Sequence, residues 1–135
     1  MVKPVTLKNI VFYADDDADD LELVQDAFDR YSNNVKVVTA KDGVQALSYL
    51  QSLNEQAITP CLIILDINMP IVSGWECLSQ FKSTEHLKEI RVIMFTTSSQ
   101  ERERDIAKQL GADGFITKPS EYKTLKELLS SVVNT

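Results

Sequence analysis

The chain has 135 residues, of which 14 are basic and 20 are acidic, and its formal net charge is −6. This length suits one domain, and a content of 44% hydrophobic and 25% charged residues is typical of a globular protein. An acidic chain lacks the basic surface that nucleic-acid phosphates require, so we expect no direct nucleic-acid partner. No apolar stretch approaches the roughly 20 residues of a membrane span and no signal peptide opens the chain, so we expect a cytoplasmic protein without a membrane partner.

Five short apolar runs alternate along the chain with segments of helical spacing. The runs are residues 10–14, 35–38, 62–65, 92–95 and 114–117. Most of them are continuous, which is typical of strands that are covered on both faces. The first intervening segment carries Leu21, Val24 and Phe28 at helical intervals, and the later segments repeat the pattern. Strand and helix alternating five times predict an α/β fold, (βα)5, with a doubly wound five-stranded parallel sheet between helices.

The acidity is concentrated in residues 15–22, which hold six acids and no base. With those six removed from 20, the remaining 14 acids balance the 14 bases, so this segment carries the whole net charge. Four of its acids are interpreted as cap and first-turn residues of the following helix, namely Asp17, Asp19, Asp20 and Glu22. A calcium loop is rejected, because Asp20 and Asp26 stand where that loop needs glycine and glutamate.

Polar residues follow four of the five predicted strands. Asp15 and Asp16 end the first strand, Asp66 the third, Thr96 and Thr97 the fourth, and Lys118 the fifth. Ligands of such sheets bind outside the carboxyl ends of the strands, at the point where the strand order reverses. We therefore expect these side chains to converge on one edge of the sheet.

Carboxylates that lie this close together repel one another, and a hard divalent cation with oxygen ligands relieves the repulsion. Mg²⁺ fits well, with Mn²⁺ as the alternative, because Mg²⁺ uses few carboxylates and leaves sites for phosphate oxygens. An added ammonium and hydroxyl make the group resemble a phosphoryl-transfer site. Asp66 ends the central strand between the acidic pair and Lys118, so it is the expected nucleophile and would form an aspartyl phosphate.

These residues make the chain resemble a response regulator receiver domain of the CheY-like kind, from bacterial two-component signalling. The resemblance covers Asn9 to Val133. It rests on the acidic pair, the segment D-I-N-M-P-I-V-S-G at residues 66–74, the T-T after the fourth strand, and F-I-T-K-P at residues 115–119. It implies a flavodoxin-like sheet of strand order 2-1-3-4-5.

The resemblance also implies a role for each residue of the acidic site. Asp66 would be the phosphoacceptor and, with Asp16, a metal ligand, while Asp15 would hold the metal mainly through water. The backbone carbonyl of Asn68 would supply a further ligand. Lys118 would pair with Asp66 at rest and with the phosphoryl oxygens afterwards.

Four further positions have implied roles in switching and access. Thr96 would be the switch hydroxyl and Phe115 the switch aromatic. Thr97 occupies the position that controls access of the phosphodonor, and Pro119 would follow a cis peptide bond. The charged run at residues 101–105 is interpreted as a solvated helix face.

The resemblance implies that the phosphodonor is a sensor histidine kinase or a histidine phosphotransfer protein. We assign residues 1–8 to an N-terminal tail, 9–133 to the receiver domain and 134–135 to the C-terminal end, with no output domain. A downstream protein partner would then act in trans, unless the sequence is an excised piece of a larger protein. The face formed by the fourth helix, fifth strand and fifth helix would bind this partner or form a homodimer.

In this signalling role we expect the chain not to be an enzyme. Three other functions are weighed against it. An aspartyl-phosphate phosphohydrolase normally has a second acid two positions after its nucleophile, where this chain has Asn68. A flavin-binding relative needs a loop that cradles phosphate, whereas aspartates follow the first strand here. A scaffold that never takes phosphate would not need every residue of the site.

Overall fold

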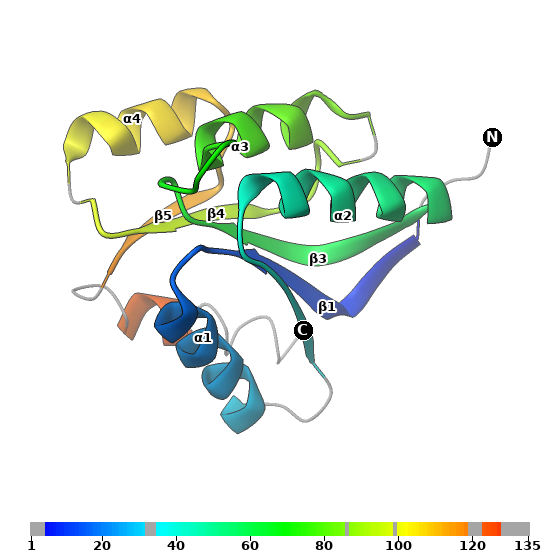
Figure 1. The fold of residues 1–135 in the computed structure, drawn as a ribbon, viewed down its shortest axis with the longest axis horizontal. Helices are drawn as coiled ribbons and strands as arrows, with labels where there is room; N and C mark the ends of the chain where they lie inside the picture. The colour runs from blue at the N-terminus through cyan, green and yellow to red at the C-terminus, as the bar shows by residue number, and fades with distance from the viewer. Residues whose placement is uncertain (1–4, 32–34, 86, 99, 119–122, 128–135) are drawn as a thin grey trace.

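A computed structural model describes residues 5–31, 35–85, 87–98, 100–118 and 123–127 (Figure 1). The strands are β1 (Val5–Ala14), β2 (Lys36–Ala40), β3 (Ile58–Leu65), β4 (Val92–Thr96) and β5 (Gly114–Thr117). The helices are α1 (Ala18–Tyr31), α2 (Gly43–Gln56), α3 (Gly74–Ser83) and α4 (Glu101–Gln109), and residues 123–127 are also helical. None of the helices in these ranges has the length and apolar character needed to cross a membrane.

The strands form one parallel sheet in the order β2-β1-β3-β4-β5, which confirms the predicted topology. Helices α2, α3 and α4 cover one face of the sheet, while α1 and the helical residues 123–127 lie on the other (Figure 1). The order reverses between β1 and β3, so the carboxyl ends of these two strands flank the crevice where ligands bind in such sheets.

Two strands begin earlier than the sequence pattern predicted. β1 starts at Val5, so residues 5–8, which we assigned to a tail, are its first part. This part pairs with the start of β3, from Val5 opposite Ile58 to Leu7 opposite Pro60, before the register shifts ahead of Val11. Neither segment is a continuous apolar run, and the backbone hydrogen bonds of the paired neighbour stabilise the extension.

Alternate residues of the central strands form two separate cores. Ile63 and Leu65 of β3 lie in the cluster beneath α2, α3 and α4, whereas Leu62 and Ile64 lie in the cluster beneath α1. All four side chains are fully buried. This burial on both faces explains why β3 is continuously apolar, and it fixes the direction in which Asp66 leaves the strand.

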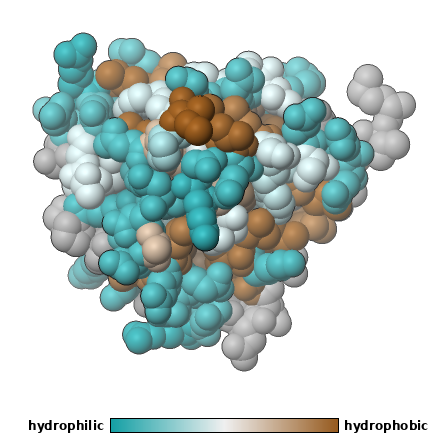
Figure 2. All heavy atoms as spheres, in the orientation of Figure 1, coloured by the Kyte–Doolittle hydropathy of each residue, from teal (hydrophilic) through white to brown (hydrophobic). Residues whose placement is uncertain are grey.

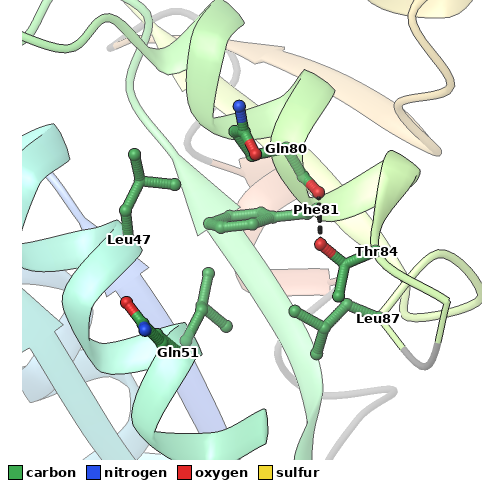
Figure 3. Close-up of a pocket in the computed structure, with 7 residues that line it drawn as sticks. Leu47, Gln51, Gln80, Phe81, Thr84 and Leu87 are labelled. Atoms are coloured by element: carbon green, nitrogen blue, oxygen red, sulfur yellow. Dashed lines mark hydrogen bonds between the residues drawn. The ribbon is translucent and has the colours of Figure 1, made fainter.

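The surface is mostly hydrophilic on the face shown in Figure 2. Helices α2 and α3 leave a groove of about 480 Å³ between them (Figure 3). It is lined by Leu47, Leu50, Gln51, Gln80, Phe81, Thr84 and Leu87. None of these is a predicted site residue, so the groove lies apart from the crevice at the strand ends.

Candidate functional site

The strand ends bring the predicted residues together at one edge of the sheet. The Asp66 amide donates to the carbonyl of Ala14 at 3.0 Å, which joins the ends of β3 and β1. The Lys118 amide donates to the carbonyl of Thr96 at 2.6 Å, which joins the ends of β5 and β4. Backbone pairing between neighbouring parallel strands therefore sets the positions of these side chains.

Asp15, Asp16 and Asp66 form a compact acidic cluster. One carboxylate oxygen from each lies within 4.8 Å of the others. Asp15 and Asp66 are buried, whereas Asp16 is exposed at the mouth of the cluster. The cluster is the group that the sequence predicted as the metal site.

The buried Lys118 ammonium lies among these carboxylates. Its Nζ is 2.6 Å from Asp15 Oδ2, 2.9 Å from Asp20 Oδ2 and 3.5 Å from Asp66 Oδ2. Nζ also lies 4.9 Å from the centroid of the Phe95 ring. Asp15 and Asp20 therefore hold the ammonium more closely than Asp66 does, whereas the resemblance implied Asp66 as its partner at rest.

The contact of Asp20 with Lys118 corrects our assignment of Asp20 to the helix terminus alone. Asp17 does cap α1, because its Oδ1 accepts from the amides of Asp19 at 2.9 Å and Asp20 at 3.3 Å. The side chain of Asp20 instead turns toward the site. Asp20 lies in the first turn of α1, directly after the acidic pair that follows β1, and this position is the signal in the sequence that could have indicated it.

Asp15 is fixed by two further donors. The Tyr13 hydroxyl donates to Asp15 Oδ2, and the Asp17 amide donates to Oδ1 at 2.9 Å. Burial and the neighbouring Asp15 charge raise the pKa of Tyr13 above its ordinary value, so the phenol stays a donor. The composition of the first strand gave no indication of this contact.

Asp66 lies in a crowded and electrostatically unfavourable position. Its Oδ1 accepts from the Ile67 amide at 2.8 Å. Burial, followed by the charge of Asp15, raises the pKa of Asp66 to about 7, although Lys118 opposes the rise. The backbone around Asp66 is equally tight, since a Cβ at Gly74 would lie 2.0 Å from the Asp66 carbonyl oxygen.

The two threonines after β4 differ in exposure. Thr96 is fully buried, and its hydroxyl accepts from the Ser98 amide at 3.5 Å, a long hydrogen bond. Thr97 is exposed at the mouth of the site. The roles in switching and access that the resemblance implies for these threonines stay predictions.

Phe115 is partly buried against the core beneath α4. The guanidinium carbon of Arg104 lies 4.8 Å from the centroid of its ring, and Arg104 Nη1 donates to the Phe115 carbonyl at 3.2 Å. Arg104 Nη2 also donates to Thr117 Oγ1 at 3.1 Å. Arg104 belongs to the run that we interpreted as a solvated face, so that interpretation was wrong for this residue.

The last two predicted features are the Asn68 carbonyl ligand and the cis peptide bond before Pro119. Asn68 is exposed two residues beyond Asp66. Pro119, with the predicted cis peptide, lies outside the described residues.

The donor set fits a divalent cation. Asp15, Asp20 and Asp66 contact one ammonium, and Asp16 lies in the same carboxylate cluster as Asp15 and Asp66, so the site has an excess of negative charge. Burial is the largest cause of the raised pKa of Asp66, and the Asp15 charge adds to it, so ionising Asp66 is unfavourable at this site. Oxygen ligands of this kind suit hard cations such as Mg²⁺ and Mn²⁺.

The family model of the response regulator receiver domain matches residues 11–130. Response regulator Rcp1 of Synechocystis sp. is 28% identical over 125 residues, which are 91% of this chain and 85% of that protein. Chemotaxis protein CheY1 of Helicobacter pylori is 35% identical over 99 residues, or 73% of this chain and 77% of that protein.

Solved structures agree with these matches. The phosphorylated cyanobacterial phytochrome response regulator RcpA has a TM-score of 0.80 and 31% identity, covering 92% of this chain and 90% of that chain. The Mn²⁺-bound form of Rcp1 has a TM-score of 0.79 and 28% identity, covering 92% of this chain and 91% of that chain. The matched residues include every strand end that contributes to the site. The chain therefore belongs to the response regulator receiver domain family of two-component signalling.

Proposed function

We propose that Asp66 accepts a phosphoryl group in a Mg²⁺-dependent reaction and that the phosphorylated site changes a partner-binding surface. The observation that supports this most strongly is the position of Asp66, which has a carboxylate oxygen within 4.8 Å of oxygens of Asp15 and Asp16 and also lies beside a buried ammonium. Receiver domains act with histidine kinases and downstream effectors, and they are signalling modules rather than classical enzymes. The donor is a sensor histidine kinase or a histidine phosphotransfer protein.

The residues that would hold the cation are Asp15, Asp16, Asp66 and the backbone carbonyl of Asn68. When bound, Mg²⁺ would neutralise charge on the carboxylates and on the phosphoryl oxygens. A structural neighbour, Rcp1, has a Mn²⁺-bound form, which supports the binding of a divalent cation by this chain. Because Asp16 is exposed and Asp15 is anchored by Tyr13, one side of the cluster is open to solvent and the other is rigid.

A carboxylate oxygen of Asp66 would attack the phosphorus of the donor phosphohistidine. The new O–P bond forms as the P–N bond breaks, and the electron pair of that bond stays on the imidazole nitrogen, which takes up a proton. Lys118 would neutralise the transferred group, and the buried Thr96 hydroxyl would donate to it. Thr97, exposed at the mouth, would limit how closely the donor approaches.

Movement of Thr96 toward the phosphoryl group would change the surface near β5. Phe115 follows it as the switch aromatic, and the contacts of Arg104 with Phe115 and Thr117 connect that movement to α4. A protein partner in trans, or a second copy of the chain, would bind the face formed by α4, β5 and the last helix.

The free thiols of Cys61 and Cys77 are consistent with a reducing cytoplasmic location.

The test is exposure of the protein to acetyl phosphate with Mg²⁺, followed by intact-mass measurement. We expect one added phosphoryl group, no addition with Asp66→Asn, and normal addition with Asp19→Asn, a nearby exposed acid. Undiminished labelling of Asp66→Asn would disprove the assignment. Steady release of phosphate from a small phosphomonoester would instead favour a phosphohydrolase.

A further inference from the structure

Lys118 is shared unequally among three carboxylates. An ammonium has three donors, and here the two shortest contacts are with Asp15 at 2.6 Å and Asp20 at 2.9 Å. The contact with Asp66 is 3.5 Å, at the outer limit of a hydrogen bond. Before any phosphoryl group arrives, the ammonium is therefore displaced from Asp66 toward the first turn of α1.

The position of Asp20 is set by the fold rather than by a mobile loop. Asp20 is in the first turn of α1, and that helix is anchored on the sheet by Val24 and Phe28, both fully buried. The side chain of Asp20 is 14% exposed and that of Lys118 is 4% exposed. A pair this well shielded from water attracts more strongly than a surface ion pair does.

Asp20 differs from Asp15 in what a cation would do to it. Asp15 belongs to the group whose oxygens lie within 4.8 Å of one another, so a bound cation would neutralise part of its charge. Asp20 is outside that group, and its hold on Lys118 would persist when the metal is bound. It would then be the main competitor of a phosphoryl group for the same ammonium.

We infer that Asp20 is a positioning residue, which restrains Lys118 and weakens its contact with a phosphoryl group on Asp66. This inference rests on the proposed function, because it assigns Asp20 a part in the same reaction. Removing the Asp20 carboxylate should release Lys118 toward Asp66 and stabilise the phosphorylated form. The residue would thus set how long the signal lasts without contacting the phosphoryl group itself.

The experiment measures the affinity of the full chain for beryllofluoride, a non-covalent phosphoryl analogue, by calorimetry at saturating Mg²⁺. We expect Asp20→Asn and Asp20→Ala to bind it at least about threefold more tightly than the wild type. Asp19→Asn is the matched control, since it removes the same charge from the same helical turn at an exposed position. Thermal unfolding of each variant confirms that it is folded. If one of the two Asp20 variants does not fold, the other still tests the inference.

A double-mutant cycle with Lys118→Met separates contact from general charge. If Asp20 acts through the ammonium, Asp20→Asn should give no tightening beyond that of Asp19→Asn when Lys118 is absent. Tightening that persists in the Lys118→Met background, or Asp20 variants that match Asp19→Asn in the wild-type background, would overturn the inference. If Lys118→Met abolishes beryllofluoride binding, the affinities of the Asp20 and Asp19 variants in the wild-type background decide whether the inference holds. A wild-type protein that binds no beryllofluoride refutes the proposed function instead.

Discussion

Replacing Asp66 with asparagine should stabilise the metal-free protein above neutral pH. The pKa of Asp66 is raised from 3.8 to about 7 because burial and Asp15 disfavour its charged form. The carboxyl therefore ionises in the unfolded chain at a lower pH than in the folded protein, and the folded state holds the extra proton between these values. Stability falls as the pH rises through this window, and the deficit is complete above about pH 7.

The size of the effect follows from the same shift. A rise from 3.8 to about 7 corresponds to about 4 kcal/mol of unfolding free energy, at about 1.36 kcal/mol for each pKa unit. Asparagine keeps the Oδ1 acceptor for the Ile67 amide and carries no charge, so it removes the deficit. We expect Asp66→Asn to gain about 2–4 kcal/mol at about pH 8 and close to nothing at about pH 4.

Urea unfolding in the presence of a chelator, followed by circular dichroism, measures both values. The control is Asp19→Asn, which removes an exposed carboxylate and should change the free energy of unfolding by less than about 0.5 kcal/mol at either pH. A gain for Asp66→Asn that is equal at both pH values would refute the reasoning, because it would have a cause other than ionisation of the buried carboxyl.

Three further predictions concern the metal site, the backbone beside Asp66 and the contact of Arg104 with Phe115. Mg²⁺ at about 100 times its dissociation constant should add about 2.7 kcal/mol to the unfolding free energy of the wild type. Asp16→Asn should lose most of that gain, and a wild type that Mg²⁺ leaves unchanged in urea unfolding would contradict the metal site. Gly74→Ala should destabilise the protein by about 2–3 kcal/mol, because its Cβ would lie 2.0 Å from the Asp66 carbonyl oxygen. Ser79→Ala, on the exposed side of α3, should leave the free energy of unfolding unchanged. Equal unfolding free energies for the two variants in urea would refute the steric argument. Arg104→Ala should cost about 1 kcal/mol and shift the aromatic NMR signals of Phe115, and Arg102→Ala, at an exposed position, should do neither.

The sequence was sufficient for the parts of the site that depend on topology alone. Parallel strands end at a common edge, so Asp15, Asp66 and Lys118 could be brought together from their positions after apolar runs, although Asp66 and Lys118 are far apart in the chain. The same reasoning failed where a contact depends on side-chain direction. The pairing of Asp20 with Lys118 requires the rotational phase of α1 and the path of a long lysine side chain across the site.

Weak local patterns account for the other differences. Residues 5–8 begin β1 because β3 offers them a partner, and a tail is the natural prediction when only the sequence of that segment is considered. Arg104 was assigned to solvent because its neighbours are charged, yet its aliphatic stem allows the guanidinium to lie against the ring of Phe115. In both cases tertiary partners decide the conformation.

The charge arrangement explains how a small site can drive a switch. Moving a two-state equilibrium from 1:99 to 99:1 takes about 5.5 kcal/mol of differential interaction. A hydrogen bond from Lys118 or Thr96 to the charged phosphoryl group would contribute about 1.5–3 kcal/mol. Two such contacts, made in only one of the two states, would together be of about the required size. Because Asp20 competes for Lys118, it reduces the contribution of the ammonium, so the balance between Asp20 and the phosphoryl group decides how completely the equilibrium moves.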